Sequence, residues 1–364
     1  MREKKKLRSG YTTGACAAAA AKAASMLAIG HISSVTSIDI PFPDGSRHEF
    51  HIHASGLNRD GRSAWASVIK DAGDDPDITN GAEIRADAVM IESAGLLIKG
   101  GKGVGTVTKP GLAIAPGEPA INPIPRKMIA AAIAEVAGPG SPGADIAGIE
   151  ITISVADGER LAEKTLNRRL GIIGGISILG STGIVKPVST EAWTATITSS
   201  MDVAKAAGLS EIVVSAGRAS ERAHMEKFHM PEEAYVLMGD YLEYSIKDAV
   251  KHGFKKIHLC AQWAKMVKIA MATPQTHVRF GAIDIAQAVE FFNLNGIAVP
   301  RDREFNTARE IFDFIRAGNT GPDLDAPLQA ACTAAKLYAE QIAEKVTVQT
   351  YLVSYDNKII MQSN

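Results

Sequence analysis

Strand and helix patterns alternate between residues 166 and 300, and this alternation constrains the fold more than any other feature of the chain. Each short apolar run is followed by a helical pattern, with strands expected at 176–179, 211–215 and 256–260 and helices at 190–207, 232–252 and 262–272. Such alternation indicates βαβ units and a mostly parallel, Rossmann-like sheet. The carboxyl ends of parallel strands meet at one edge, so three loops are expected to share a rim: 180–186, 215–221 and 261–265.

Residues 170–187, the glycine run, interleave aliphatic stretches with five glycines. A continuous apolar run bounded by glycines indicates a buried strand of a parallel sheet. Glycines at strand ends let the backbone come close to a bulky ligand, because no Cβ stands in the way. Tight strand–helix packing without a ligand explains the same glycines equally well, and the pattern alone leaves both interpretations open.

The flanking regions have different patterns. Residues 1–165 predict an α+β domain, with helices at 15–27 and 125–136, a hairpin at 35–41 and 47–53, and strands at 64–70, 83–91 and 149–155. Residues 301–364 predict helices at 304–317 and 328–344 and a closing hairpin at 346–353 and 357–361. We therefore expect three segments: an α+β domain (1–165), a Rossmann-like α/β domain (166–300), and C-terminal helices with a hairpin packed on the rest (301–364).

Composition excludes several classes of function. The net charge is −1 and only 5% of residues are aromatic, so neither phosphate neutralisation nor base stacking favours a nucleic-acid partner. Cys16, Cys260 and Cys332 are far apart, which favours a reducing compartment and no cysteine zinc site. The apolar run after the basic N-terminus is mostly alanine and contains Lys22, so it predicts neither a signal peptide nor a membrane span. We expect a cytoplasmic protein without a membrane partner or a protein-bound metal.

Common catalytic motifs do not fit. The glycines at 101–105 lack the frame of a Walker loop and the third glycine of a dinucleotide fingerprint. Residues 48–51 miss the H-E-x-x-H motif by one position, and no G-x-S-x-G elbow is present. His51 and His53 share one face of a predicted strand, but two histidines without a third ligand are more typical of a solvated face.

Several blocks resemble a known family. They are residues 8–20 (RSGYTTGACAAAA), 73–84 (GDDPDITNGAEI), 107–112 (VTKPGL), 116–123 (PGEPAINP) and 171–187. In this order they resemble the cobalt-precorrin-5B C(1)-methyltransferases of anaerobic cobalamin biosynthesis. Two positions depart from the family pattern: Ala15 stands where threonine is expected, and residues 261–265 (AQWAK) stand where the family more often has Gly and His.

The resemblance implies S-adenosylmethionine as methyl donor and a cobalt-bearing, ring-contracted tetrapyrrole as acceptor, methylated at ring carbon 1 to give cobalt-precorrin-6A. Transient hand-over of the substrate from neighbouring pathway enzymes is a further implication. The transfer is an in-line displacement at a sulfonium carbon, for which orientation of the two ligands contributes about 7–11 kcal/mol at best. Strong acid–base machinery is not required, and no catalytic residue is assigned.

The methyl donor is expected at the glycine run, with the backbone close to the adenosyl group at Gly174, Gly175, Gly180, Ser181, Thr182 and Gly183. No acidic residue is expected to hold the ribose after the second predicted strand, since residues 211–215 run into Ala-Gly-Arg. Glu191 or Glu221 are alternatives for that role, although each also fits a plain helix-start residue.

The acceptor carries many carboxylates, so a locally basic site is expected. The candidates are Tyr11, Thr12, Thr13, Lys109, Arg126, Lys186 and Arg218, with Lys102, Lys265 and Arg279 as further cations. The first three precede a helix whose N-terminus can bind an anion, although Thr12 or Thr13 also fits a simple N-cap. For each cation the alternative is a solvated surface charge.

Two other classes of protein also fit the sequence. An oxidoreductase would place a dinucleotide on the sheet of residues 166–300. A non-catalytic tetrapyrrole-binding protein would bind the corrinoid and ignore the methyl donor.

Overall fold

A computed structural model describes residues 7–30, 32–58, 63–137, 140, 147–273, 276, 283–318 and 322–364. The chain forms two compact units, Met1–Ser189 and Thr190–Asn364, and each is described by itself. The boundary therefore differs from the expected one at 165/166. Residues 166–189 belong to the first unit because their short strands pair with strands of that unit. Residues 301–364 belong to the second unit.

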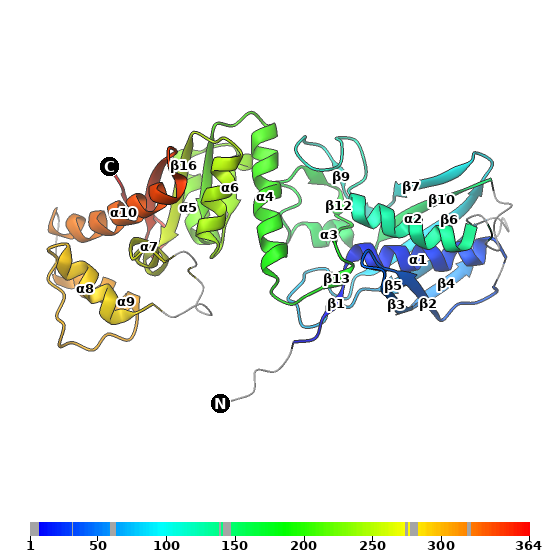
Figure 1. The fold of residues 1–364 in the computed structure, drawn as a ribbon, viewed down its shortest axis with the longest axis horizontal. Helices are drawn as coiled ribbons and strands as arrows, with labels where there is room; N and C mark the ends of the chain where they lie inside the picture. The colour runs from blue at the N-terminus through cyan, green and yellow to red at the C-terminus, as the bar shows by residue number, and fades with distance from the viewer. Residues whose placement is uncertain are drawn as a thin grey trace. The chain divides into compact units, whose positions relative to one another are not determined.

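The first unit is built on a mixed five-stranded sheet of order β4-β5-β6-β10-β7. Its strands are β4 (Ala54–Leu57), β5 (Ser63–Ile69), β6 (Glu83–Ile91), β10 (Gly148–Val155) and β7 (Gly95–Gly100). All neighbours are antiparallel except β10 and β7. The helices α1 (Thr13–Ala28) and α2 (Pro123–Ala137) pack together, with α1 against β5 and β6 (Figure 1). The expected hairpin forms as β2 (Ser37–Pro41) and β3 (Arg47–His51).

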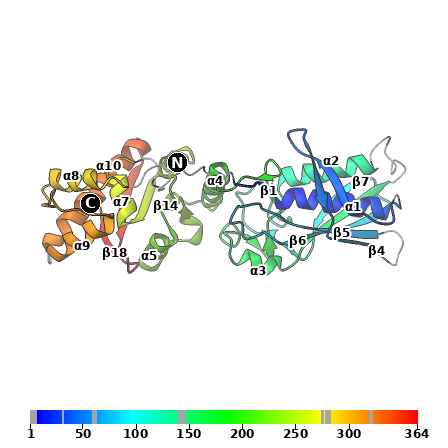
Figure 2. The same cartoon turned by 90° about the horizontal axis from the view of Figure 1, so that it is seen from below.

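Alanine explains the position of α1. Nearly every residue of this helix is buried, because side chains of one carbon allow the sheet and α2 to approach it closely. The cation of this helix, Lys22, forms an ion pair with Glu135 of α2, and Arg47 of β3 binds the same carboxylate at 2.6 Å. Gly14 lies against Pro125 near the start of both helices. These two contacts show that α1 and α2 run in the same direction (Figure 2).

The glycine run does not form the expected strand of a parallel sheet. It contributes three two-residue strands, β11 (Ile172–Ile173), β12 (Gly175–Ile176) and β13 (Ile184–Val185). Their partners are short strands of the first unit: β9 (Thr106–Val107), β8 (Gly103–Val104) and β1 (Gly10–Tyr11). The short helix α3 (Gly158–Ala162) lies beside β8 and β12. The predicted position of residues 180–186 on the rim of the parallel sheet is therefore wrong.

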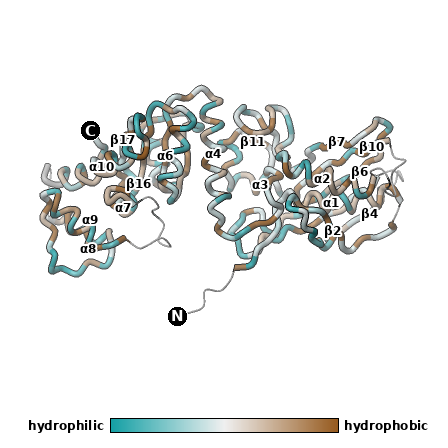
Figure 3. The backbone as a smooth tube through the Cα atoms, viewed as in Figure 1, coloured by the Kyte–Doolittle hydropathy of each residue, from teal (hydrophilic) through white to brown (hydrophobic). Residues whose placement is uncertain are grey.

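The second unit contains the mostly parallel sheet that the alternation predicts, in the order β15-β14-β16-β17-β18. The strands are β14 (Glu211–Ser215), β15 (Tyr235–Leu237), β16 (Lys256–Gln262), β17 (Thr347–Val353) and β18 (Ile359–Gln362), of which only β18 is antiparallel. In chain order this is a 2-1-3-4-5 arrangement, whose direction reverses between β14 and β16. Figure 3 colours these strands by hydropathy.

Helices cover both faces of this sheet. α5 (Arg218–Phe228) packs on one face, over Val213, Cys260 and Tyr351. The other face belongs to the main core of the unit, which includes α4 (Thr190–Ala206), α6 (Leu242–Lys251), α7 (Trp263–Ala270), α8 (Ile285–Leu294), α9 (Ala308–Gly318) and α10 (Pro322–Ala343). The single helix predicted at 232–252 is wrong, because the 3-10 turn η1 (Glu232–Ala234) and β15 precede α6. No helix within the described residues is long and apolar enough to cross a bilayer.

Candidate functional site

The segment 177–183 lies over the N-terminus of α1. The Gly14 amide donates to the Leu179 carbonyl at 3.0 Å, and the Leu179 amide donates to the Thr13 hydroxyl at 2.9 Å. The Thr12 amide donates to the Gly183 carbonyl at 3.0 Å. The structure thus brings together two groups of candidates that the sequence assigned to different ligands.

Thr12 is the N-cap of α1. Its hydroxyl accepts from the Ala15 amide at 3.2 Å, a contact of the kind that stabilises a helix by about 1 kcal/mol. The Tyr11 and Cys16 amides donate to the carbonyls of Asp71 and Thr12. Because these amides are already bonded within the chain, the geometry favours the structural role of Thr12 over a backbone cradle for a carboxylate. The binding roles of Tyr11, Thr12 and Thr13 stay predictions.

Tyr11 packs in an aromatic cluster beside this helix start. Its ring centroid lies 4.4 Å from that of Phe50, and its hydroxyl lies 3.5 Å from Nδ1 of His48. Phe42 completes the cluster at 6.2 Å from Tyr11. Tyr11 is half-buried.

Three glycines of the run are explained by packing within the first unit. A Cβ at Gly175 would lie 2.2 Å from the Gly103 carbonyl oxygen, and one at Gly180 would lie 2.5 Å from the Thr12 side chain. At Gly183 it would meet the Phe42 ring at 2.4 Å. The chain itself therefore fills the space into which a Cβ would point, which favours the packing interpretation of these glycines. Donor binding at Gly175, Gly180 and Gly183 stays a prediction.

The remaining donor candidates are open to solvent. Gly174 has a φ of +85°, and a Cβ added there would have nothing within 4 Å of it. Ser181 and Thr182 are exposed, and the Thr182 hydroxyl accepts from the Ile184 amide at 3.2 Å. Donor binding at Gly174, Ser181 and Thr182 stays a prediction.

Two candidate lysines lie in the same unit. Lys109 is half-buried, and its aliphatic stem packs against Gly171, where a Cβ would meet Cγ of Lys109 at 2.5 Å. Lys186 follows β13 directly and is exposed. Lys102 is also exposed, whereas Arg279 lies outside the described residues. Of these cations, Lys109 is the one whose position is fixed by packing against the glycine run.

Arg126 lies in a cavity of about 380 Å³ at the start of α2. The cavity is lined by Ala113, Ile114, Ala115, Glu118, Ile121, Pro123 and Arg126. Nε of Arg126 donates to the Ile121 carbonyl at 2.9 Å, and its Nη2 lies 3.7 Å from Glu118 Oε2. The Glu118 carboxylate is 60% exposed and sits beyond hydrogen-bond distance, so this ion pair is loose. A ligand carboxylate can replace it.

The N-termini of α1 and α2 meet at the same end of the first unit. The Asn122 amide donates to the Ile178 carbonyl at 2.9 Å, next to the Leu179 carbonyl bound by α1. Two parallel helices add their dipoles, so this end has a positive potential. Together with Arg126 it forms a surface suited to anionic groups.

The second unit has a different candidate site at the carboxyl edge of its parallel sheet. Gly217, between β14 and α5, is the N-cap of α5, has an extended φ of −175°, and nothing lies within 4 Å of its Cβ position. Arg218 is the first residue of this helix and is exposed. The structure therefore places Arg218, like Lys265, on the second unit, whereas Tyr11, Thr12, Thr13, Lys109, Arg126 and Lys186 belong to the first.

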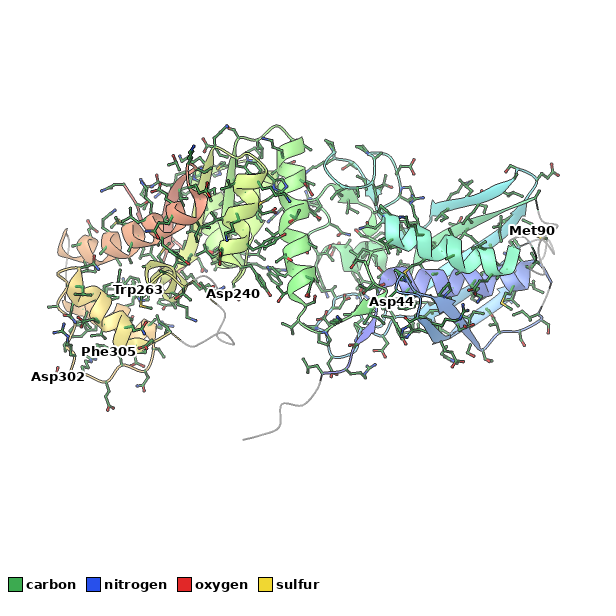
Figure 4. The ribbon with its side chains drawn as sticks, in the orientation of Figure 1. Asp44, Met90, Asp240, Trp263, Asp302 and Phe305 are labelled. Atoms are coloured by element: carbon green, nitrogen blue, oxygen red, sulfur yellow. The ribbon has the colours of Figure 1, made fainter. Side chains whose placement is uncertain are left out.

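Lys265 contacts two of the loops at this edge. Its Nζ donates to the Ala216 carbonyl at 2.6 Å, after β14, and lies 3.0 Å from Asp240 Oδ1, after β15. Figure 4 labels Asp240 together with Trp263, which directly follows β16. The expected shared rim is thus confirmed for the loops 215–221 and 261–265. In open α/β sheets, ligands bind in the crevice where strand order reverses, here between β14 and β16.

As expected, no acidic residue directly follows β14, the strand predicted at 211–215. The second strand of the sheet is β15, which the sequence did not reveal because it is only three residues long. Asp240 follows it, roughly 20 residues beyond the first glycine loop, the spacing at which an acidic residue binds a ribose in nucleotide-binding sheets. Its Oδ1 also accepts from the Thr276 hydroxyl at 2.7 Å.

A buried polar cluster lies under α5 and was not predicted. His258 lies 2.8 Å from Glu211 Oε2 and 2.9 Å from the Tyr351 hydroxyl, while Nδ1 of His224 lies 3.2 Å from the Tyr235 hydroxyl. Burial lowers the pKa of His224 to about 3 and raises the pKa of Tyr351 to about 12. The His224 and Tyr351 side chains therefore stay neutral at ordinary pH and act as core.

Fold and sites together define the class of protein. It is a two-unit α/β protein with a cavity beside Arg126 in the first unit and an open edge on the parallel sheet of the second. A family model described as CbiD matches residues 1–187. The chain belongs to the CbiD family.

Curated relatives match over nearly the whole length. A cobalt-precorrin-5B C(1)-methyltransferase of Desulfotalea psychrophila is 47% identical, covering 98% of this chain and 98% of the relative. One from Geobacter metallireducens is 40% identical with the same coverage. A solved cobalamin biosynthesis protein from Archaeoglobus fulgidus is 27% identical over 72% of this chain and 79% of that chain, with a TM-score of 0.40, too low to carry weight.

Proposed function

We propose that this protein is a C-methyltransferase that acts on cobalt-precorrin-5B at ring carbon 1, with S-adenosylmethionine as methyl donor. The observation that carries the proposal is the 47% identity to a relative of that name over 98% of both chains. The dinucleotide oxidoreductase and the non-catalytic carrier receive no support from these relatives. Hand-over of substrate by a neighbouring enzyme stays a prediction.

The acceptor is proposed to bind where α1 and α2 begin. Arg126 would form a bidentate pair with a peripheral carboxylate of the corrinoid, replacing its loose contact with Glu118. The apolar wall of the cavity, including Ile114, would lie against the edge of the macrocycle. Lys109 and Lys186 would add positive charge on the same unit.

The donor is proposed to bind at the carboxyl edge of the sheet in the second unit. This edge fits a nucleoside because Gly217 leaves its backbone open and Asp240 stands where a ribose-binding carboxylate is expected. When bound, the donor supplies a sulfonium methyl group, whose carbon–sulfur bond breaks toward sulfur as the new carbon–carbon bond forms. Lys265 would act as a positioning residue, since it holds the loops after β14 and β15 in place.

Substitution of Arg126 tests the acceptor site. We expect Arg126→Gln to raise the KM for the corrinoid about 10-fold or more, because a charge-assisted hydrogen bond contributes about 1.5–3 kcal/mol. Affinity for the donor, measured by titration with S-adenosylhomocysteine, should not change. Steady-state methylation at varied corrinoid concentration measures the first effect.

Two variants serve as controls for this test. Lys127→Gln removes a neighbouring exposed charge and should leave KM unchanged. Glu118→Gln removes the competing carboxylate and should lower KM or leave it unaltered. An Arg126→Gln protein with normal KM would remove Arg126 from the acceptor site.

A further inference from the structure

A second cavity of the first unit lies beside the start of α1, where its lining includes Tyr11 and Cys16 together with residues of β3 and β5. It has a volume of about 220 Å³ and is lined by Tyr11, Cys16, Glu49, Phe50, His51, His53, Val68, Ile69 and Asp71. Its floor is made by the buried side chains of Cys16, Phe50 and Val68. Glu49, His51 and His53 follow one another at every second residue along the extended chain and so face the same side.

The imidazoles of His51 and His53 have no bonding partner within the described part of the molecule. Neither His51 nor His53 makes a side-chain hydrogen bond, ion pair or ring contact there. His48, on the same strand, is packed against Phe42 and lies 3.2 Å from the Ser46 hydroxyl. Both His51 and His53 are exposed, so their nitrogens are open to a ligand at the mouth of the cavity.

The cavity is not an ordinary metal site. No group of three metal-ligating side chains within the described residues is placed to hold an ion. A metal already held in a macrocycle is a different case, because the ring nitrogens fill its equatorial positions and only an axial ligand is missing. Neutral imidazole is a suitable axial donor for a first-row transition metal.

The other side chains of the cavity fit a cationic centre. Glu49 places a negative charge beside the histidines, which favours the cobalt cation, whereas Asp71, the other acidic residue of the lining, is paired with Arg8 at 2.6 Å. Burial raises the pKa of the Cys16 thiol to about 12, so Cys16 stays protonated and does not compete as a thiolate ligand. Typical small-molecule sites have volumes of about 300–1,000 Å³. The volume of this cavity is smaller, so a macrocycle would lie across the mouth of the cavity.

We propose that one of the two imidazoles, His51 or His53, supplies the axial ligand to the cobalt of the corrinoid acceptor, an inference that rests on the proposed function. An imidazole nitrogen donates its lone pair to cobalt, and a water molecule leaves that axial position. Tyr11, which lines the same cavity, flanks the bound ring. The pair thereby selects the cobalt-containing ring over the metal-free one.

Electron paramagnetic resonance of a cobalt(II) corrinoid tests this inference. The probe is cob(II)yrinic acid, which keeps the ring, the metal and the free carboxylate arms. Frozen mixtures with the wild-type protein should show nitrogen superhyperfine splitting of the cobalt lines, and protein containing nitrogen-15 histidine should change that splitting. The double variant His51→Gln/His53→Gln should lose it, whereas His48→Gln should retain it.

The outcomes separate this inference from the proposed function. A wild-type mixture without nitrogen splitting, or splitting that persists in the double variant, would overturn the axial ligand. Methylation of cobalt-precorrin-5B by the same wild-type preparation shows whether the enzymatic activity stands independently. The double variant replaces exposed side chains, so circular dichroism should show an unchanged fold.

Discussion

Substitution of Gly180 by valine is expected to lower the free energy of unfolding by about 3 kcal/mol or more, from backbone strain and a lost helix cap. Gly180 has a φ of +131°, and its Cβ position lies 2.5 Å from the Thr12 side chain. A valine there would force Thr12 away from its capping position at the start of α1. Chemical denaturation followed by circular dichroism measures the change.

Gly174→Val is the matched control for this prediction. Gly174 also has a positive φ, of +85°, but nothing lies within 4 Å of its Cβ position. This variant carries the backbone strain alone, about 1 kcal/mol. Equal stability of the two variants would contradict the packing interpretation of Gly180. A stable Gly180→Val protein that fails to bind S-adenosylhomocysteine would instead place the donor at the glycine run.

The variant Gly217→Val is expected to weaken S-adenosylhomocysteine binding at least 10-fold, or about 1.4 kcal/mol, while the stability of the protein is unchanged. Because φ at Gly217 is −175°, any residue adopts this backbone, and the Cβ position is free of neighbours. The added side chain would occupy space at the N-terminus of α5 that the proposed nucleoside approaches. Isothermal titration calorimetry gives the affinity.

A second glycine of the same unit provides the control. Gly318, at the end of α9, also has open space around its Cβ position and is exposed. Gly318→Val should bind S-adenosylhomocysteine as the wild type does. Normal binding by Gly217→Val would show that the donor does not use this edge of the sheet.

Local sequence patterns predicted the elements whose apolar or helix-forming residues recur with the period of a helix or a strand. The alanine helix, the hairpin around residues 43–45 and the strand at 83–91 form close to the expected residues. The two-residue strands of the glycine run have no such signal, because β12 pairs with β8 about 70 residues earlier. α5 was missed because its sequence is strongly polar, and β15 because three residues show no period.

The candidate sites were predictable to a smaller extent. Arg126 was singled out because it follows a Pro-rich block, and the structure places it in a cavity. The glycines at 175, 180 and 183 were assigned to a ligand because sequence alone does not show which chain segment lies above each of them. His51 and His53 matched the pattern of a solvated face, and only the structure shows that they line one cavity together with residues of β5.

The proposed reaction itself is measured by incubating the protein with cobalt-precorrin-5B and S-adenosylmethionine that carries an isotope-labelled methyl group. A C(1)-methyltransferase should give a labelled methyl at ring carbon 1 in the nuclear magnetic resonance spectrum, with S-adenosylhomocysteine formed in equal amount. A corrinoid that binds the protein but stays unlabelled would contradict the proposed function and favour a non-catalytic carrier.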